Sequence, residues 1–168
     1  MKSLIVSLSL LGAVSAVAIG ALGGCSLKSS GDGDTPVAQK PLEGKIGGKA
    51  FSGKVAIATK SADRYSVSIY SGDRKCTDTS TSSTDGYVLF SSADWKDGVS
   101  YGLILDLTGG KSNTVTLVTP PSTNTICSDG RVEIVTVGSK EAAGTLRVRA
   151  VSNSDNTVEG EVPLYTCD

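Results

Sequence analysis

The sequence predicts an all-β protein, namely an antiparallel β-sandwich of about eight or nine short strands, with a β-barrel-like arrangement as the alternative. Two observations support this fold class. From Gly44 onward, short runs of β-branched and aromatic residues are separated by clusters of Gly, Asp, Asn, Ser and Pro, which is the pattern of strands joined by turns. In addition, no apolar pattern keeps a 3.6-residue period over the length of a helix.

Nine segments fit the strand pattern. Each is rich in residues that favour strands and is bounded by turn residues. The predicted strands are 45–51, 53–59, 64–70, 86–91, 100–108, 113–119, 131–137, 144–151 and 157–166. They follow one another without a long interruption, so we expect residues 43–168 to form a single domain.

Alternation along three of these strands predicts which side chains face the core. The alternating apolar positions are Tyr65, Val67 and Ile69 in one strand and Tyr101, Leu103, Leu105 and Leu107 in another. Successive side chains of a strand point to opposite faces, so each set is predicted to face the core. In residues 131–137 the apolar side chains change from even to odd positions after Ile134. Either a β-bulge or a strand that is covered on both faces would produce this change.

The last two strands are predicted to form a hairpin with a defined register. Asn153 to Asn156 mark the turn, and Val151 is placed opposite Thr157. The resulting pairs are Arg149 with Glu159 and Arg147 with Glu161 on one face, and Leu146 with Val162, Val148 with Gly160 and Ala150 with Val158 on the other. A shift by one residue would turn charged side chains toward the core, so both faces specify the same register.

The amino-terminal residues predict export and lipidation. Lys2 is followed by an apolar run from Leu4 to Leu22 and by small residues before Cys25, which is the pattern of a signal peptide. The Leu-Gly-Gly-Cys ending resembles the lipobox of bacterial lipoproteins. That resemblance implies that residues 1–24 are removed, that Cys25 is acylated, and that the acyl chains attach the protein to a membrane.

Residues 25–42 are predicted to be the lipidated amino terminus and a flexible linker. The stretch is rich in Ser, Gly and Asp and has little to bury, which is typical of a tether. Ser26 follows Cys25, and it is not the Asp that in known lipoproteins often signals retention at the inner membrane. By this resemblance we expect a protein anchored in the outer membrane, facing the periplasm or the cell surface.

Charge and composition exclude several classes of function. Removal of residues 1–24 takes away one of the 16 basic residues and none of the 17 acidic residues, which leaves 15 basic and 17 acidic residues. A nucleic-acid-binding protein would normally show a clustered positive excess, so no nucleic-acid partner is expected. Histidine is absent, which removes the commonest metal ligand and the usual general base near neutral pH. No cofactor or metal is expected.

The cysteine count predicts one disulfide and one free thiol. If Cys25 is lipidated, Cys76, Cys127 and Cys167 remain, and an exported protein meets conditions in which disulfides form. The long spacings between these cysteines differ from the short paired spacings of a zinc site. The residues alone leave the connectivity open among the three possible pairs.

The domain resembles uncharacterised β-sandwich lipoproteins of Gram-negative bacteria. The resemblance lies in Gly48 to Phe51, the strand that leads to Cys76, Asp129 to Ile134, Gly144 to Val148, and Val158 to Cys167. It covers most of residues 44–168 and implies no activity. It implies a disulfide between Cys76 and Cys167, with Cys127 free, although Cys127 itself departs from the pattern of those proteins and keeps the other two pairings open.

Two aromatic residues are candidate ligand contacts. Trp95 lies in the predicted loop Asp94-Trp95-Lys96-Asp97-Gly98, where a tryptophan can stack on a sugar or anchor a protein partner. Tryptophans are also highly buried on average, so Trp95 can equally cap one end of the fold. Tyr70 is the second candidate, because its odd separation from Tyr65 places the two rings on opposite faces of the same strand.

These observations favour a non-catalytic binding or structural module, anchored to a membrane through Cys25, with a protein or polysaccharide as its ligand. No catalytic motif is evident, and the protein is not expected to be an enzyme. The alternative is a carboxylate-based hydrolase of envelope glycan, which needs two acidic side chains about 5–9.5 Å apart in a cleft. The candidate pairs for that reaction are Asp94 with Asp97 and Asp73 with Asp78.

Overall fold

A computed structural model describes residues 35–78, 84–105, 113–121 and 123–167, so the predicted signal peptide and Cys25 lie outside the described residues. Within these ranges the chain forms eleven β-strands and no helix. The strands are β1 Glu43–Ile46, β2 Lys49–Ser52, β3 Val55–Ser61, β4 Arg64–Tyr70, β5 Tyr87–Ser92, β6 Val99–Gly102, β7 Val115–Thr119, β8 Thr123–Cys127, β9 Asp129–Thr136, β10 Gly144–Asn153 and β11 Asn156–Cys167. The predicted all-β class is confirmed.

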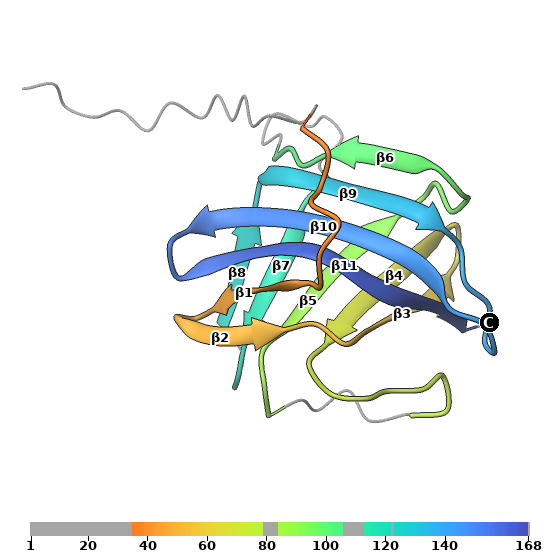
Figure 1. Cartoon of the computed structure of the whole chain (residues 1–168), viewed down its shortest axis with the longest axis horizontal. Helices are drawn as coiled ribbons and strands as arrows, with labels where there is room; N and C mark the ends of the chain where they lie inside the picture. The colour runs from red at the N-terminus through yellow and green to blue at the C-terminus, as the bar shows by residue number, and fades with distance from the viewer. Residues whose placement is uncertain (1–34, 79–83, 106–112, 122, 168) are drawn as a thin grey trace, which may run out of the picture.

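The strands form one mixed sheet that curls into a half-barrel (Figure 1). Their order is β6-β9-β10-β11-β3-β4-β5-β7-β8, and β1 and β2 branch from β11. All neighbouring strands are antiparallel except β11 and β3, which are parallel. The curl brings β6, β9, β10 and β11 over β3, β4, β5, β7 and β8, and the core fills the space between these two halves.

The long strand β11 joins the two halves. One of its edges pairs with β10 over nearly its whole length. The other edge pairs first with β1, at residues 157–159, and then with β3, at residues 164–167. Between these two stretches, the backbone of Glu161 bonds to Lys40 and Leu42. The carboxyl-terminal strand is therefore surrounded by backbone partners along both edges.

The hairpin predicted from the sequence is confirmed in every pair. Val151 lies opposite Thr157, Arg149 opposite Glu159 and Arg147 opposite Glu161, and the three apolar pairs follow the same register. Leu146, Val148 and Ala150 are fully buried, which agrees with the expected inner face. The register followed from two faces that require the same alignment.

One predicted strand is two strands and one strand was not predicted, so the strand count rises from nine to eleven among the described residues. Residues 45–51 form a hairpin, β1 and β2, because Gly47 and Gly48 have φ angles of 59° and 76°. Glycine adopts this left-handed region without steric cost, so the pair reverses the chain. Strand β8 was missed because Thr123–Cys127 follows Pro120-Pro121 and contains mostly polar residues.

A third prediction was wrong for the strand after Ser100. Strand β6 ends at Gly102, and Leu105 is 37% exposed instead of facing the core. Leu103 does reach the core, where its amide N–H bonds to the Gly130 carbonyl. The chain then leaves β9 and Ile104 forms a bridge with Asn113 instead. Leu107 lies outside the described residues.

The change from even to odd apolar positions in β9 results from a β-bulge. Leu146 of β10 lies opposite Ile134, whereas its neighbour Thr145 lies opposite Thr136. Val135 is therefore an extra residue in β9, and the alternation of faces restarts after it. The change of parity lets Val137 pack against the core after the strand has ended.

Residues 35–42, which the sequence analysis places in the linker, lie against the sheet. Val37 and Leu42 are only 3% and 0% exposed. The Val37 amide donates a hydrogen bond to Oε1 of Glu133 on β9, at 3.3 Å, and the segment crosses β10 to reach β11 and β1 (Figure 1). A side chain at Gly160 would overlap the carbonyl of Pro41, so glycine is needed where the segment passes over β11.

Candidate functional site

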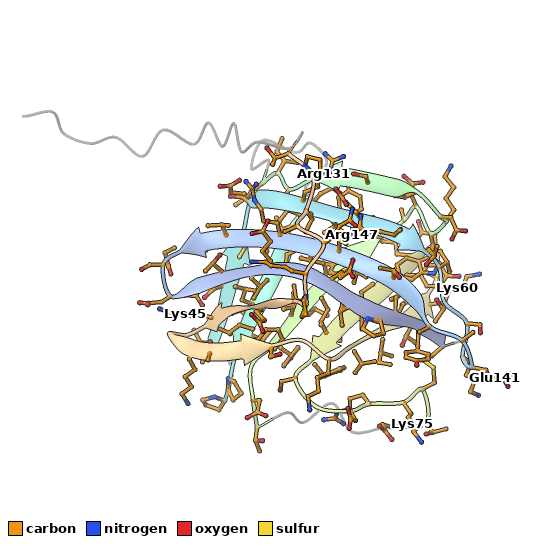
Figure 2. All side chains as sticks on the ribbon, viewed as in Figure 1. Lys45, Lys60, Lys75, Arg131, Glu141 and Arg147 are labelled. Atoms are coloured by element: carbon orange, nitrogen blue, oxygen red, sulfur yellow. A yellow bond between two sulfur atoms is a disulfide. The ribbon has the colours of Figure 1, made fainter. Side chains whose placement is uncertain are left out.

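The strongest candidate for a ligand site is a hollow of about 430 Å³ beside the carboxyl-terminal end of β11. Its wall combines three cationic side chains with a single carboxylate and one tyrosine ring. The lining residues are Arg74, Lys75, Cys76, Thr77, Lys140, Glu141 and Tyr165. They come from the loop after β4, the loop between β9 and β10, and β11 itself. Figure 2 shows Lys75 and Glu141 at this end of the molecule, with Lys45 at the opposite end.

One wall of the hollow is fixed by the disulfide between Cys76 and Cys167, whose Cα atoms are 5.4 Å apart. This is the pairing that the resemblance implies, and it is confirmed. The loop is also closed on itself, because the Lys75 amide donates to Oδ2 of Asp78 at 2.8 Å and the Asp78 amide donates to the Lys75 carbonyl at 3.0 Å. These bonds use the backbone of Lys75, and its exposed side chain lines the hollow.

The opposite wall is a turn held by Ser139. Its hydroxyl oxygen accepts hydrogen bonds from the amides of Ala142, at 3.0 Å, and Glu141, at 3.3 Å. The Ser139 amide donates to the Ala142 carbonyl at 2.8 Å. This turn presents the exposed side chains of Lys140 and Glu141 to the hollow. Both walls therefore have a defined backbone, which lowers the cost of ordering the site when a ligand binds.

Tyr70, a predicted contact residue, lies next to this hollow rather than in it. Its ring stacks on that of Tyr87, with centroids 5.9 Å apart, and the Arg74 guanidinium lies over its face at 5.0 Å from the centroid. A guanidinium within about 6 Å of a ring centroid is attracted by the negative face of the ring. Tyr70 therefore positions Arg74, which is a lining residue of the hollow.

Trp95, the other predicted contact residue, is half-buried and packs against the core. Its ring stacks on Tyr65, with centroids 4.6 Å apart and planes 12° apart. Its indole Nε1–H donates to Oγ1 of Thr166 at 3.3 Å. Both its ring and its N–H group thus have partners inside the protein, and the structure places Trp95 as a cap on the core.

The carboxylates considered for hydrolysis have structural partners or are exposed. Oδ1 of Asp97 accepts a hydrogen bond from the Val137 amide at 2.6 Å, and Asp78 closes the loop at Lys75. Asp94 and Asp73 are exposed. The hollow beside β11 contains one carboxylate, that of Glu141.

Two buried titratable groups lie in the core. Cys127 is the free cysteine, fully buried, and burial together with the nearby Asp129 charge raises the pKa of its thiol to about 11. Burial also raises the pKa of Tyr101 to about 12, although Ser92 and Arg64 lower it in part. Ser92 lies close enough to Tyr101 to affect this pKa, but its hydroxyl donates to the Asp94 carbonyl, and within the described ranges no group meets hydrogen-bond geometry with the Tyr101 hydroxyl.

The described ranges contain no group of three or more His, Cys, Asp or Glu side chains placed to hold a metal ion. They also contain no helix with the length and apolarity needed to cross a bilayer. Comparisons with protein-family models, with curated proteins and with solved structures gave no match.

Sequence reasoning did not identify the residues of the hollow. They lie in three segments, residues 74–77, residues 140–141 and Tyr165, the first of which is more than 60 positions from the other two, and only the fold brings them together. One signal was available: Lys75 precedes Cys76 and Tyr165 lies two positions before Cys167. A bridge between these cysteines places their flanking residues side by side, so the implied disulfide also implied this meeting of a cation and a ring.

Proposed function

We propose that this protein is a lipid-anchored envelope protein whose β domain, a sandwich formed by the two halves of the curled sheet, is a non-catalytic binding module. The observation that supports binding is the hollow beside the disulfide, where Arg74, Lys75 and Lys140 surround the Tyr165 ring and Glu141 is the lone carboxylate. The rest of the mature chain has a slight acidic excess, so the positive charge is local to this site.

The chemistry of the lining favours an anionic polysaccharide as the ligand. Guanidinium and ammonium groups form charge-assisted hydrogen bonds with carboxylate, sulfate or phosphate groups. A half-buried tyrosine ring supplies an apolar surface for the face of a sugar. Because Tyr165 lies on a strand and the cations lie on two pinned turns, the backbone positions that carry the ring and the charges keep a fixed separation.

The position of the amino terminus fits a module held near a membrane surface. Val37 contacts Glu133 on the outer face of β9, and it lies only twelve positions after Cys25. Fully extended, twelve residues span roughly 40 Å, so the domain stays within that distance of the lipid. We infer an outer-membrane location, in which the domain faces the periplasm or the cell surface.

Binding is tested with the mature chain, residues 25–168 with Cys25→Ser, against acidic polysaccharides and a neutral polysaccharide of the same backbone. We expect saturable binding to at least one acidic polysaccharide, measured by calorimetry, with an affinity that falls as salt is added. Lys75→Glu and Lys140→Glu should each weaken binding by about tenfold or more, because each reverses a charge at the ligand. The matched control, Lys45→Glu, reverses an exposed charge at the opposite end of the molecule and should change affinity less than twofold.

Two results would contradict the binding proposal: no acidic polysaccharide binds, or Lys45→Glu weakens binding as much as Lys75→Glu does. Anchoring is tested separately by growing cells with an alkyne fatty acid and probing the purified protein for the label. We expect label on the wild-type protein and none on Cys25→Ser. An unlabelled wild-type protein would refute the anchor without affecting the binding proposal.

A further inference from the structure

Strand β8 is an edge of the described sheet, with exposed side chains along most of its length and its buried end, Cys127, close to β10. It pairs with β7 on one side and has no strand on the other among the described residues. Thr123, Asn124 and Ile126 are exposed, and Ile126, at 53%, is the most exposed large apolar side chain in the described ranges. An open edge presents unpaired N–H and C=O groups to any extended partner.

The residues of β8 give this edge none of the usual protection. Edge strands are normally guarded by charged side chains, proline or bulges. Thr123–Cys127 has no charged residue, no proline and no glycine, and it pairs with β7 without a register shift. By contrast, β2, which pairs only with β1, begins with Lys49.

Charge is absent from most of this half of the sheet. Strands β3, β4, β5, β7 and β8 together contain two charged residues, Lys60 and Arg64. Strands β9, β10 and β11 contain seven: Asp129, Arg131, Glu133, Arg147, Arg149, Glu159 and Glu161. Two copies can therefore approach each other at β8 without a repulsive field between like-charged strands.

The outer face next to β8 carries a row of uncharged side chains, four of them apolar or aromatic and two of them, Ser68 and Thr116, hydroxyl residues. Paired positions run across six neighbouring strands in the order Tyr165, Ile57, Ser68, Leu89, Thr116 and Ile126. None of these side chains is fully buried. The row ends at the open edge with Ile126, where an added strand would cover this side chain.

We propose that β8 is a self-association edge, at which a second copy of this chain pairs antiparallel through its own β8. Two identical strands paired antiparallel are related by a two-fold axis, so each edge satisfies the other in the same way. Full overlap of the five residues centres the axis on Thr125 and sets Asn124 opposite the partner subunit's Ile126. The sheets of the two copies then become one continuous sheet.

The test is the mass of the mature chain, residues 25–168 with Cys25→Ser, measured by sedimentation equilibrium between about 1 and 200 μM. We expect a monomer–dimer equilibrium within this range. Ile126→Lys should leave only monomer, because it places a charge at the unprotected edge. Ile104→Lys is the matched control, since Ile104 is 47% exposed and lies outside β8, and this variant should dimerise like the wild type.

The register is tested by a cysteine at the proposed axis. Thr125→Cys should give a covalent dimer on mild oxidation, whereas Ser91→Cys, exposed on β5, should stay monomeric on a non-reducing gel. A mature chain that is monomeric through 200 μM would overturn the proposal, and so would equal dissociation of the Ile126→Lys and Ile104→Lys variants. A circular-dichroism melt of each variant confirms that it is folded, so that loss of the dimer is not loss of the fold.

Discussion

Arg147 of β10 lies opposite Glu161 of β11, and its Nε donates to Oε2 of that glutamate at 3.1 Å. Arg149 lies opposite Glu159 in the same way, yet its ion pair is with Asp129 of β9, at 3.9 Å. Backbone register therefore decides which residues face each other, and the neighbouring strand decides which charges meet. The result is a network on the outer face of β9, β10 and β11, which Figure 2 shows around Arg131 and Arg147.

Glu133 is the centre of this network, and its removal should destabilise the fold. Its carboxylate accepts from Nε of Arg131 at 3.0 Å and from the Val37 amide at 3.3 Å, and lies 3.8 Å from Arg147. Its side chain is only 14% exposed. We expect Glu133→Ala to lower the free energy of unfolding by about 1–3 kcal/mol, because two arginines and an amide lose a shared acceptor.

The measurement for Glu133 is denaturant unfolding, with Glu159→Ala as the control on the same face. Glu159 lies at the edge of the network, opposite Arg149, and its replacement should cost no more than about 0.5 kcal/mol. If both variants lose the same stability, the network has no special centre. Limited proteolysis of Glu133→Ala should also cut sooner before residue 42, because Val37 loses its anchor.

The disulfide should contribute more to stability than any single side chain. Cys76 and Cys167 are 91 residues apart in sequence, and the chain-entropy model gives roughly 4–4.5 kcal/mol for a loop of this length. We expect Cys76→Ser to approach that loss in denaturant unfolding. The matched control is Cys127→Ser, which replaces a cysteine that forms no bridge.

Thiol counting checks the same assignment directly. The mature chain with Cys25→Ser, unfolded without reductant, should react with one equivalent of a thiol reagent, and with three equivalents after reduction. Two or more reactive thiols before reduction would contradict the bridge. A single reactive thiol in the Cys127→Ser variant would contradict the assignment of Cys127 as the free cysteine.

The sequence predicted correctly those strands in which the apolar face and the polar face require the same bounds or register. Strand β4 was predicted with its observed bounds from its alternating apolar residues. The β10–β11 hairpin was predicted with its register, because charges on one face and apolar residues on the other exclude a slip by one residue. The predictions failed where a local feature determines the structure. Gly47-Gly48 reverses the chain inside a continuous strand pattern, and β8 lacks alternation strong enough to separate it from a loop.

The candidate site was less predictable than the fold for a topological reason. Lys75, Lys140 and Tyr165 meet only because the parallel pairing of β11 with β3 brings the carboxyl-terminal end beside the loop that follows β4. Local patterns carry no information about that pairing, since parallel partners are distant in sequence. The aromatic residues that composition drew attention to, Trp95 and Tyr70, have partners within the protein.

Trp95 is predicted to act as a cap on the core, and its replacement should affect stability rather than ligand affinity. Trp95→Ala removes the stack on Tyr65 and the hydrogen bond to Thr166, and we expect a loss of roughly 3 kcal/mol in unfolding free energy. Trp95→Phe keeps most of the stack and should lose about half as much. Ligand affinity, measured below the melting temperature, should change less than twofold, and a larger loss for Trp95→Phe would mean that the ring touches the ligand.

Stability should fall in alkaline solution because two buried acids hold their protons more tightly in the folded state. The pKa of Cys127 rises from 9.0 to about 11 and that of Tyr101 from 10.0 to about 12. Between pH 9 and 12 the unfolded chain therefore loses protons that the folded chain keeps, and the free energy of unfolding decreases as pH rises. A shift of two units corresponds to roughly 2–3 kcal/mol for each group over its own range.

Tyr101→Phe separates this proton linkage from packing. The variant removes a buried hydroxyl that has no hydrogen-bond partner in the described part of the chain, so stability at pH 7 should stay the same or rise by about 1 kcal/mol. Above pH 10 the variant should lose stability less steeply than the wild type, because one of the two linked protons is gone. Denaturant unfolding at pH 7, 9 and 10.5 measures both effects. Equal slopes for the two proteins would mean that Tyr101 ionises in the folded state as readily as in the unfolded chain, and that its hydroxyl is hydrated rather than buried.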